Sequence, residues 1–177
     1  MNQKSLEKVL DHLHIQDAYA TCVDAKVAHW FDRRQVFESF TRINWTTGDI
    51  SVAEIAFHGD ENREGANLAH FMKFMVCTRT RIVRAGEGHV PDDADDLDES
   101  DVLFDLKADF VVEYVVRGIK PDALPQTGIA AFASHNMPYH LWPYYRQFAQ
   151  DVAQRFRVPA PVIPYYRVPD THRPRKR

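Results

Sequence analysis

Strict alternation of apolar and polar positions makes residues 102–117 the clearest element of the chain. Apolar side chains occupy every second position from Val102 to Val116, and charged side chains fill most of the positions between them. A strand with one buried and one solvent-facing side has this period of two, whereas a strand covered on both faces is apolar throughout. The pattern therefore predicts a long strand of an antiparallel sheet.

Three further segments alternate less strictly and are also predicted to be strands. They comprise residues 15–29, 50–57 and 68–84. In the first, Ile15 and Tyr19 are expected to share one face with the apolar residues that follow. In the third, apolar and threonine side chains alternate with basic ones. Residues 30–49 carry aromatic side chains among charged ones and are expected to form a long connection.

Two segments have helical spacing. Residues 5–14 place leucine and valine at i, i+3, i+4 and i+7, and Ser5 can cap the first turn. Such a short helix could bind a partner, but packing on its own domain is the favoured interpretation. A second helix is predicted from Pro143, where a missing N–H is tolerated, to Arg157, because Pro159 prevents continuation. Strands followed by a helix indicate an α+β domain with helices on one face of an antiparallel sheet.

Composition and charge narrow the class of protein. The chain has 177 residues, 45% hydrophobic and 27% charged, as in one soluble globular domain. Its net charge of −3 provides no basic field for nucleic acid. No apolar run is long enough to span a bilayer, and the N-terminal stretch lacks the apolar core of a signal peptide, so a cytoplasmic protein is expected. Cys22 and Cys77 form no metal or disulfide pattern, and each is expected to be a buried side chain of a strand.

Candidate chemistry is sparse. The chain contains none of the common motifs for phosphate, dinucleotide, hydrolase or zinc-protease sites. Seven carboxylates in residues 90–101 resemble a calcium loop, but the central glycine and closing glutamate are missing, so a solvated hairpin connection is favoured. Two histidine pairs, His12 with His14 and His135 with His140, lack the spacing of a metal site. We therefore expect no catalytic residue, metal or cofactor.

The stretch 136–169 is rich in tyrosine, tryptophan and proline. Tyr145, Phe148 and Phe156 have the spacing of a helix face that packs on a sheet. Other aromatic residues fall partly outside that face, namely Tyr139, Trp142, Tyr144, Tyr165 and Tyr166. Tyrosine and tryptophan combine a large apolar area with a polar edge, which suits a surface that is alternately wet and occupied. This stretch favours a non-catalytic groove for apolar segments of another chain.

The same stretch resembles SecB, the bacterial protein-export chaperone, and its SecB-like relatives. The similar features are the step Trp142-Pro143-Tyr144, Arg146 with the apolar helix face after it, Pro159, and Pro164-Tyr165-Tyr166. The order of elements also agrees, and Ile15-Gln16 with Tyr19 is similar to the start of that family's first strand. The resemblance covers about residues 13–168.

This resemblance implies a SecB-like four-stranded antiparallel sheet with helices packed on one face. The parts of the chain are then an N-terminal amphipathic helix (1–14), a SecB-like domain (15–168) and a basic, disordered tail (169–177), which solubilises the chain or meets an acidic partner. The implied activity is ATP-independent holding of unfolded or unassembled polypeptides by a homotetramer, a dimer of dimers. The groove would lie between the crossover loop and the helical region. Its candidate lining is Phe37, Phe40, Trp45, Tyr139, Trp142 and Tyr165.

Two departures from the family bear on the client. Exporting SecB proteins meet SecA through acidic residues on exposed sheet positions, and the corresponding positions here are Cys22, Lys26, Asp105 and Lys107. The family's C-terminal helix, which contributes to the SecA contact, is replaced by the charged, proline-containing residues 167–177. Both departures weaken a general export role. They favour a dedicated client, such as an antitoxin within a toxin–antitoxin system.

Two other classes of function stay open. The sheet and aromatic pocket could serve an enzyme or a small-ligand binder, or the apolar strip could be the oligomer interface of a structural subunit. Suppression of aggregation without nucleotide is the property that distinguishes a chaperone from the enzyme or small-ligand binder.

Overall fold

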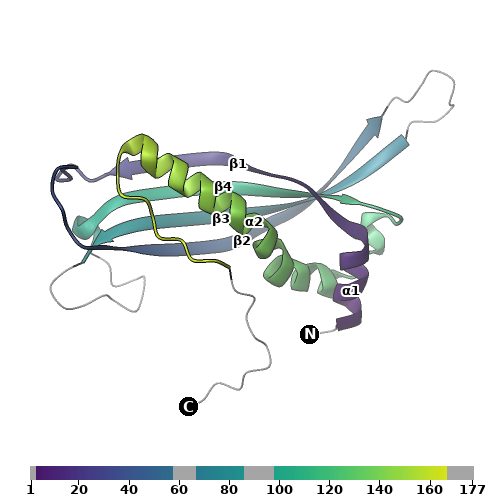
Figure 1. Cartoon of the computed structure of the whole chain (residues 1–177). Helices are drawn as coiled ribbons and strands as arrows, with labels where there is room; N and C mark the ends of the chain where they lie inside the picture. Colours follow the sequence, from purple (N-terminus) through teal and green to yellow (C-terminus); the bar gives the residue numbers. More distant parts are fainter. Residues whose placement is uncertain (1–2, 58–66, 86–97, 167–177) are drawn as a thin grey trace, which may run out of the picture.

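The chain forms one antiparallel sheet with helices on one face, as expected (Figure 1). The computed structural model describes residues 3–57, 67–85 and 98–166. The sheet has the order β1-β4-β3-β2. Its elements are α1 (Gln3–His12), β1 (Leu13–Val27), β2 (Ser39–Phe57), β3 (Asn67–Arg84), β4 (Val102–Val116) and α2 (Gln126–Phe156), with short 3-10 turns at Glu99–Asp101 and Pro121–Ala123. Most of the predicted acidic connection and the whole basic tail lie outside the described residues.

The two central strands behave as their alternation predicts. One side of β4 is buried beneath α2. The buried residues on that side are Phe104, Leu106, Ala108, Phe110, Val112, Tyr114 and Val116. β3 adds Met72, Phe74, Val76, Thr78, Thr80 and Ile82 on the same side. The opposite sides carry ion pairs between these strands, Lys73 with its register partner Glu113 and Arg79 with Asp105 on the diagonal. Period-two patterning thus identified both strands and the side that each one buries.

β2 is longer than predicted, because it begins at Ser39 within the segment that we expected to be a connection. Ile43 and Trp45 lie opposite Thr80 and Thr78 and therefore face the core side of the sheet. A register shift between Thr47 and Ile50 interrupts the alternation there. An extra residue in one strand reverses the phase of the side chains after it, and this hides the strand from a simple period-two reading.

Two bulges in β1 change which face of the sheet its side chains occupy, relative to the prediction. Register shifts lie between Ile15 and Asp17 and between Ala20 and Cys22. Ile15 consequently pairs with Tyr114 on the core side, whereas Tyr19 pairs with Val111 on the other side. The prediction that Ile15 and Tyr19 share a face was wrong.

The two cysteines are also exposed, which contradicts their predicted burial. Cys22 and Cys77 flank Asp109 from the neighbouring strands, on the sheet face that points away from α2. The Asp109 carboxylate, through its hydrogen bond, and burial raise the pKa of the Cys77 thiol. An exposed thiol in this position is a polar surface group of the sheet.

α2 begins at Gln126, seventeen residues before the predicted start at Pro143, and it contains Pro138 and Pro143 in its interior. An interior proline costs a helix about 3 kcal/mol or more, so packing must offset that cost. A row of side chains at every fourth position does so, comprising Ile129, Ala133, Met137, Leu141, Tyr145, Ala149 and Ala153, all buried. The helix ends at the predicted place, with Arg157 in the left-handed conformation (φ 57°).

α1 packs on the first turns of α2. Val9 is fully buried, and a Cβ on Gly128 would lie 2.2 Å from the Ser5 carbonyl oxygen. Only a residue without a side chain allows the two backbones to approach so closely. This contact supports the interpretation that the first helix packs on its own domain.

Candidate polypeptide-binding site

An aromatic cavity of about 400 Å³ opens where the middle of α2 meets the extended segment 161–166. Its lining is Ile15, Tyr139, His140, Trp142, Pro143, Tyr144, Tyr165 and Tyr166. Most of these residues come from the predicted aromatic stretch. Ile15 comes from β1, because the bulge beside it keeps this side chain on the helix side of the sheet. We call this cavity the aromatic cavity below.

Trp142 fixes the extended segment to the helix. Its indole Nε1–H donates to the Pro164 carbonyl at 2.6 Å, and its ring lies 5.5 Å from Tyr166 and 6.1 Å from Trp45 of β2. The Arg146 guanidinium lies over the Tyr165 ring at 4.6 Å. Edge-on and tilted ring pairs of this kind stabilise contacts beyond the burial of area alone. The cavity wall is therefore an ordered structure.

Three tyrosines present apolar area to solvent at this cavity. Tyr139 is 58% exposed, Tyr144 49% and Tyr165 79%. Exposed aromatic side chains that gather around a cavity are typical of surfaces that contact other chains. Their hydroxyl groups keep the surface wettable when it is empty.

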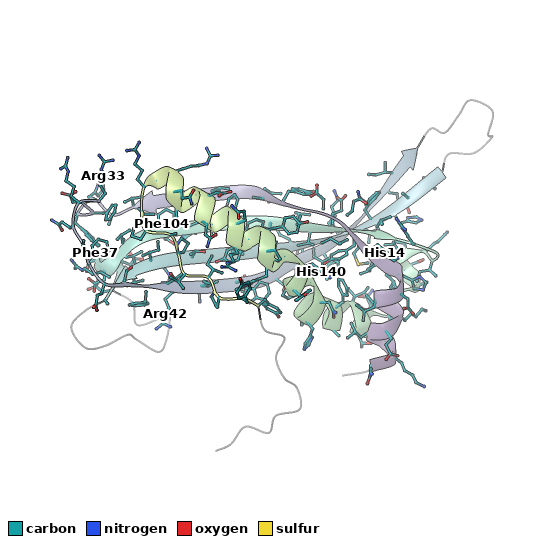
Figure 2. The ribbon with its side chains drawn as sticks, in the orientation of Figure 1. His14, Arg33, Phe37, Arg42, Phe104 and His140 are labelled. Carbon is teal, nitrogen blue, oxygen red and sulfur yellow. The ribbon has the colours of Figure 1, made fainter. Side chains whose placement is uncertain are left out.

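Four of the six predicted lining residues gather here. Tyr139, Trp142 and Tyr165 line the aromatic cavity, and Trp45 packs edge-on against Trp142 behind it. Phe37 lies elsewhere, at the end of the sheet shown in Figure 2, where it packs on Trp30 and Phe31.

Phe40 lies apart from the cavity as well. It pairs with Val83 in the register, on the face away from α2, and the Arg42 guanidinium lies over its ring at 5.3 Å. Both phenylalanines were assigned to one loop with Trp45. Phe37 lies in the loop before β2, whereas Phe40 and Trp45 lie within β2, where alternation sends them to opposite faces of the sheet.

His140 is a lining residue that sequence reasoning did not assign to the site. Its Nδ1 lies 2.9 Å from the hydroxyl oxygen of Tyr114, a fully buried residue of β4. Burial lowers the pKa of His140 below its ordinary value and raises that of Tyr114. Both groups are therefore neutral at physiological pH. The histidine was considered only as a metal ligand, and no cluster of three or more histidine, cysteine or acidic residues suited to a metal occurs in the described part of the chain.

A second cavity, of about 480 Å³, lies beside the outer edge of β2 at the N-terminal end of α2. Ile50, Val52 and Met72 supply its apolar wall, and the imidazole of His70 lies 3.2 Å from the Glu54 carboxylate beside it. β2 is an edge strand, so within residues 3–57, 67–85 and 98–166 no strand neighbours it along that edge. An edge strand presents unpaired N–H and C=O groups that can pair with an extended chain.

The four positions that the resemblance to SecB relates to the SecA contact lie on the sheet face that points away from α2. Lys26 pairs with Asp105 in the register, and Cys22 with Asp109. Asp105 is the acidic member of the four, and its carboxylate accepts two hydrogen bonds from Arg79, at 2.8 Å each. The four positions are therefore of mixed charge, and the one acid among them is already paired.

Comparison with known proteins finds similarity among solved structures. No family model matches the sequence, and no curated protein matches it. Among solved structures, a SecB-like chaperone of Mycobacterium tuberculosis, in complex with a ChAD peptide from the HigA1 antitoxin, matches with a TM-score of 0.58 and 12% identity. The match covers 94% of this chain and 99% of that one. In the described residues, no helix has the length and apolarity needed to cross a membrane. The chain thus has a SecB-like α+β fold, with an aromatic cavity formed by its long helix and the segment after it.

Proposed function

We propose that this protein is an ATP-independent chaperone of the SecB-like type, which holds unfolded or unassembled polypeptides. The observation that carries the proposal is the aromatic cavity, where exposed tyrosines surround an ordered Trp142 anchor. Aromatic rings bind diverse apolar side chains with little loss of conformational entropy. The uncharged lining suits apolar segments better than charged small molecules.

The bound client is an extended segment. The free edge of β2 offers backbone hydrogen bonds, and the exposed side chains of Ile50, Val52 and Ile55 offer apolar contact along it. A segment with apolar side chains and an unpaired backbone can use both the strand edge and the apolar side chains along it.

We further propose a dedicated client, such as the disordered segment of an antitoxin. The structural neighbour was solved with an antitoxin peptide, and the paired, mixed-charge sheet face of this chain is a weak match for SecA. An export role remains the alternative. It predicts binding to SecA in low-salt buffer, whereas a dedicated chaperone shows none.

The assembly that we propose is the homotetramer implied by the resemblance to SecB. Light scattering at several protein concentrations measures it directly. The addition of an unfolded peptide separates two roles of the aromatic surface. If the peptide binds without dissociating the oligomer, the surface is a groove; if the peptide dissociates it, the surface is a subunit interface.

Aggregation of a chemically denatured protein after dilution, without nucleotide, tests the chaperone function. The wild type is expected to suppress aggregation, and the double variant Tyr139→Ala/Tyr165→Ala is expected to lose most of this effect. Both side chains are largely exposed, so their removal leaves the fold intact. Tyr19→Ala is the matched control, because Tyr19 is a partly exposed tyrosine on the opposite face of the sheet.

Two results would contradict the proposal. One is an equal loss of activity in the Tyr19→Ala control. The other is a wild-type protein that leaves aggregation unchanged while a small molecule raises its melting temperature, which would favour the small-ligand binder.

A further inference from the structure

The aromatic cavity contains one oriented polar group, the imidazole of His140. The other polar atoms of its side chains are tyrosine hydroxyls, which rotate freely, and the indole N–H of Trp142, which the Pro164 carbonyl already occupies. His140 is partly buried between Tyr114, Phe132 and Tyr139, with ring centroids 5.8, 6.2 and 6.0 Å away. Its orientation is thus determined by packing as well as by its hydrogen bond.

Tyr114 determines which nitrogen of His140 carries the proton. The Tyr114 hydroxyl is buried and, among the described residues, has the Nδ1 of His140 as its hydrogen-bond partner. If Nδ1 carried the proton, the phenol O–H would be left buried without an acceptor, which is costly. The arrangement that satisfies both groups has the phenol donating to a bare Nδ1. The neutral imidazole then carries its proton on Nε2.

The Nε2–H group is left for an occupant of the cavity. In the part of the chain that the structure describes, Tyr114 is the hydrogen-bond partner of His140, and it takes Nδ1. We infer that His140 is a specificity-determining residue, whose Nε2–H donates to a carbonyl oxygen of the client segment when an apolar or aromatic side chain of that segment fills the cavity. This inference rests on the proposed function, and it adds a geometric requirement to it.

A neutral donor in an aromatic setting selects a particular class of ligand. A peptide presents a carbonyl oxygen close to every side chain, so an extended peptide meets both the aromatic lining and the donor. A hydrocarbon of the same shape meets the lining alone and leaves the N–H unpaired, which weakens its binding. The cavity therefore distinguishes peptide from lipid-like or purely apolar compounds.

The first test measures the tautomer. In protein labelled with ¹⁵N-histidine, the two ring nitrogens of His140 give separate NMR signals, assigned with a His140→Asn variant. The expected spectrum has a bare Nδ1 and a protonated Nε2. Tyr114→Phe removes the hydroxyl that donates to Nδ1, and a mixture of the two tautomers of His140 is expected. A wild-type spectrum with the proton on Nδ1 overturns the inference.

The second test compares two small probes that carry the same ring. N-acetyl-tryptophanamide has backbone carbonyls, and 3-methylindole has none. Ligand-observed NMR measures the Kd of each probe for the wild type and for His140→Asn. The asparagine oxygen can still accept from Tyr114, so this variant keeps the buried phenol paired but lacks a donor at the Nε2 position. His140→Phe would leave that phenol unpaired and is less suitable.

The expected result is a preference of the wild type for the amide that falls by about three- to tenfold in His140→Asn, the effect of one hydrogen bond. An unchanged preference overturns the inference. If Tyr139→Ala/Tyr165→Ala loses aggregation suppression while the preference is unchanged, the proposed function stands without the donor. If aggregation suppression and probe binding are both absent from the wild type, the proposed function fails together with the inference.

Discussion

Among the described glycines, Gly128 is the one where an added methyl group would meet the closest atoms. In Gly128→Ala the new Cβ would lie 2.2 Å from the Ser5 carbonyl oxygen and 2.8 Å from Cγ2 of Val9. Ordinary contact begins near 3.4 Å, so α1 and α2 must separate by roughly 1 Å, as overpacked cores do. The obstacle is backbone, which cannot rotate away as a side chain can.

The expected change in the free energy of unfolding follows from two opposing effects. Overpacking of a packed contact costs about 1–3 kcal/mol, and replacement of glycine by alanine within a helix returns about 1 kcal/mol. Because the clash is with main chain and occurs at the buried Val9, we expect the upper part of that range and a net loss of about 1–2 kcal/mol. For a chain of this length that loss lowers Tm by about 2–8 °C.

Gly48→Ala is the matched control for this prediction. A Cβ there would lie 3.5 Å from the nearest atoms of Met75, which is ordinary contact. Urea and thermal unfolding, followed by circular dichroism, should show Gly128→Ala destabilised and Gly48→Ala near the wild type. If Gly128→Ala is as stable as the control, then α1 does not hold this close contact in solution and the reasoning is refuted.

Three further predictions concern the sheet and the cavity. Tyr145→Phe should lower the free energy of unfolding by about 1–3 kcal/mol, because it leaves the buried Thr80 hydroxyl without its hydrogen-bond partner. Urea unfolding of the double variant Tyr145→Phe/Thr80→Val should show that most of this loss is recovered. Asp105→Asn should lower the free energy of unfolding by about 1 kcal/mol, because it removes one charge of the ion pair that two hydrogen bonds join to Arg79. The difference from the wild type should be smaller in 1 M salt than in dilute buffer. Burial lowers the pKa of His140 below 6.5, so the folded state prefers the neutral ring; stability from this group is complete above about pH 6.5 and is lost as the pH falls from there toward the folded pKa. Urea midpoints measured across that range should fall further in the wild type than in His140→Asn, and equal slopes would contradict this assignment.

Local patterning was enough to predict the architecture of this chain. Alternation along β4 and β3 identified both central strands and their buried sides, because those strands have neighbours on both edges and one continuous apolar face. Signals of local conformation also placed the end of α2 at Arg157. The order of strands and helix then allowed an α+β fold to be inferred from the sequence.

Where local rules failed, tertiary packing outweighed a local preference. The interior prolines of α2 argued for a helix that begins at Pro143, but burial of a row of side chains from Ile129 onward extends the helix to Gln126. In β1, inserted residues reverse the phase of the alternation, so the pattern alone assigned Tyr19 to the wrong face. Phe40 was assigned to a connection that is in fact the start of β2, where pairing with β3 places it on the face away from α2. A bulge depends on pairing with a neighbouring strand, which one segment of sequence does not contain.

The candidate site, like the fold, was only partly predictable from the sequence. The sequence by itself determined that tyrosine and tryptophan gather in residues 139–166 in excess of what one helix face can bury, and that an aromatic surface results. Only the tertiary structure decided which of them meet: it brought Trp45 from β2 to Trp142, placed Phe37 and Phe40 elsewhere, and set His140 against Tyr114. The physical reason is that composition and periodicity act along the chain, whereas a cavity and an oriented donor exist only between segments that the fold brings together.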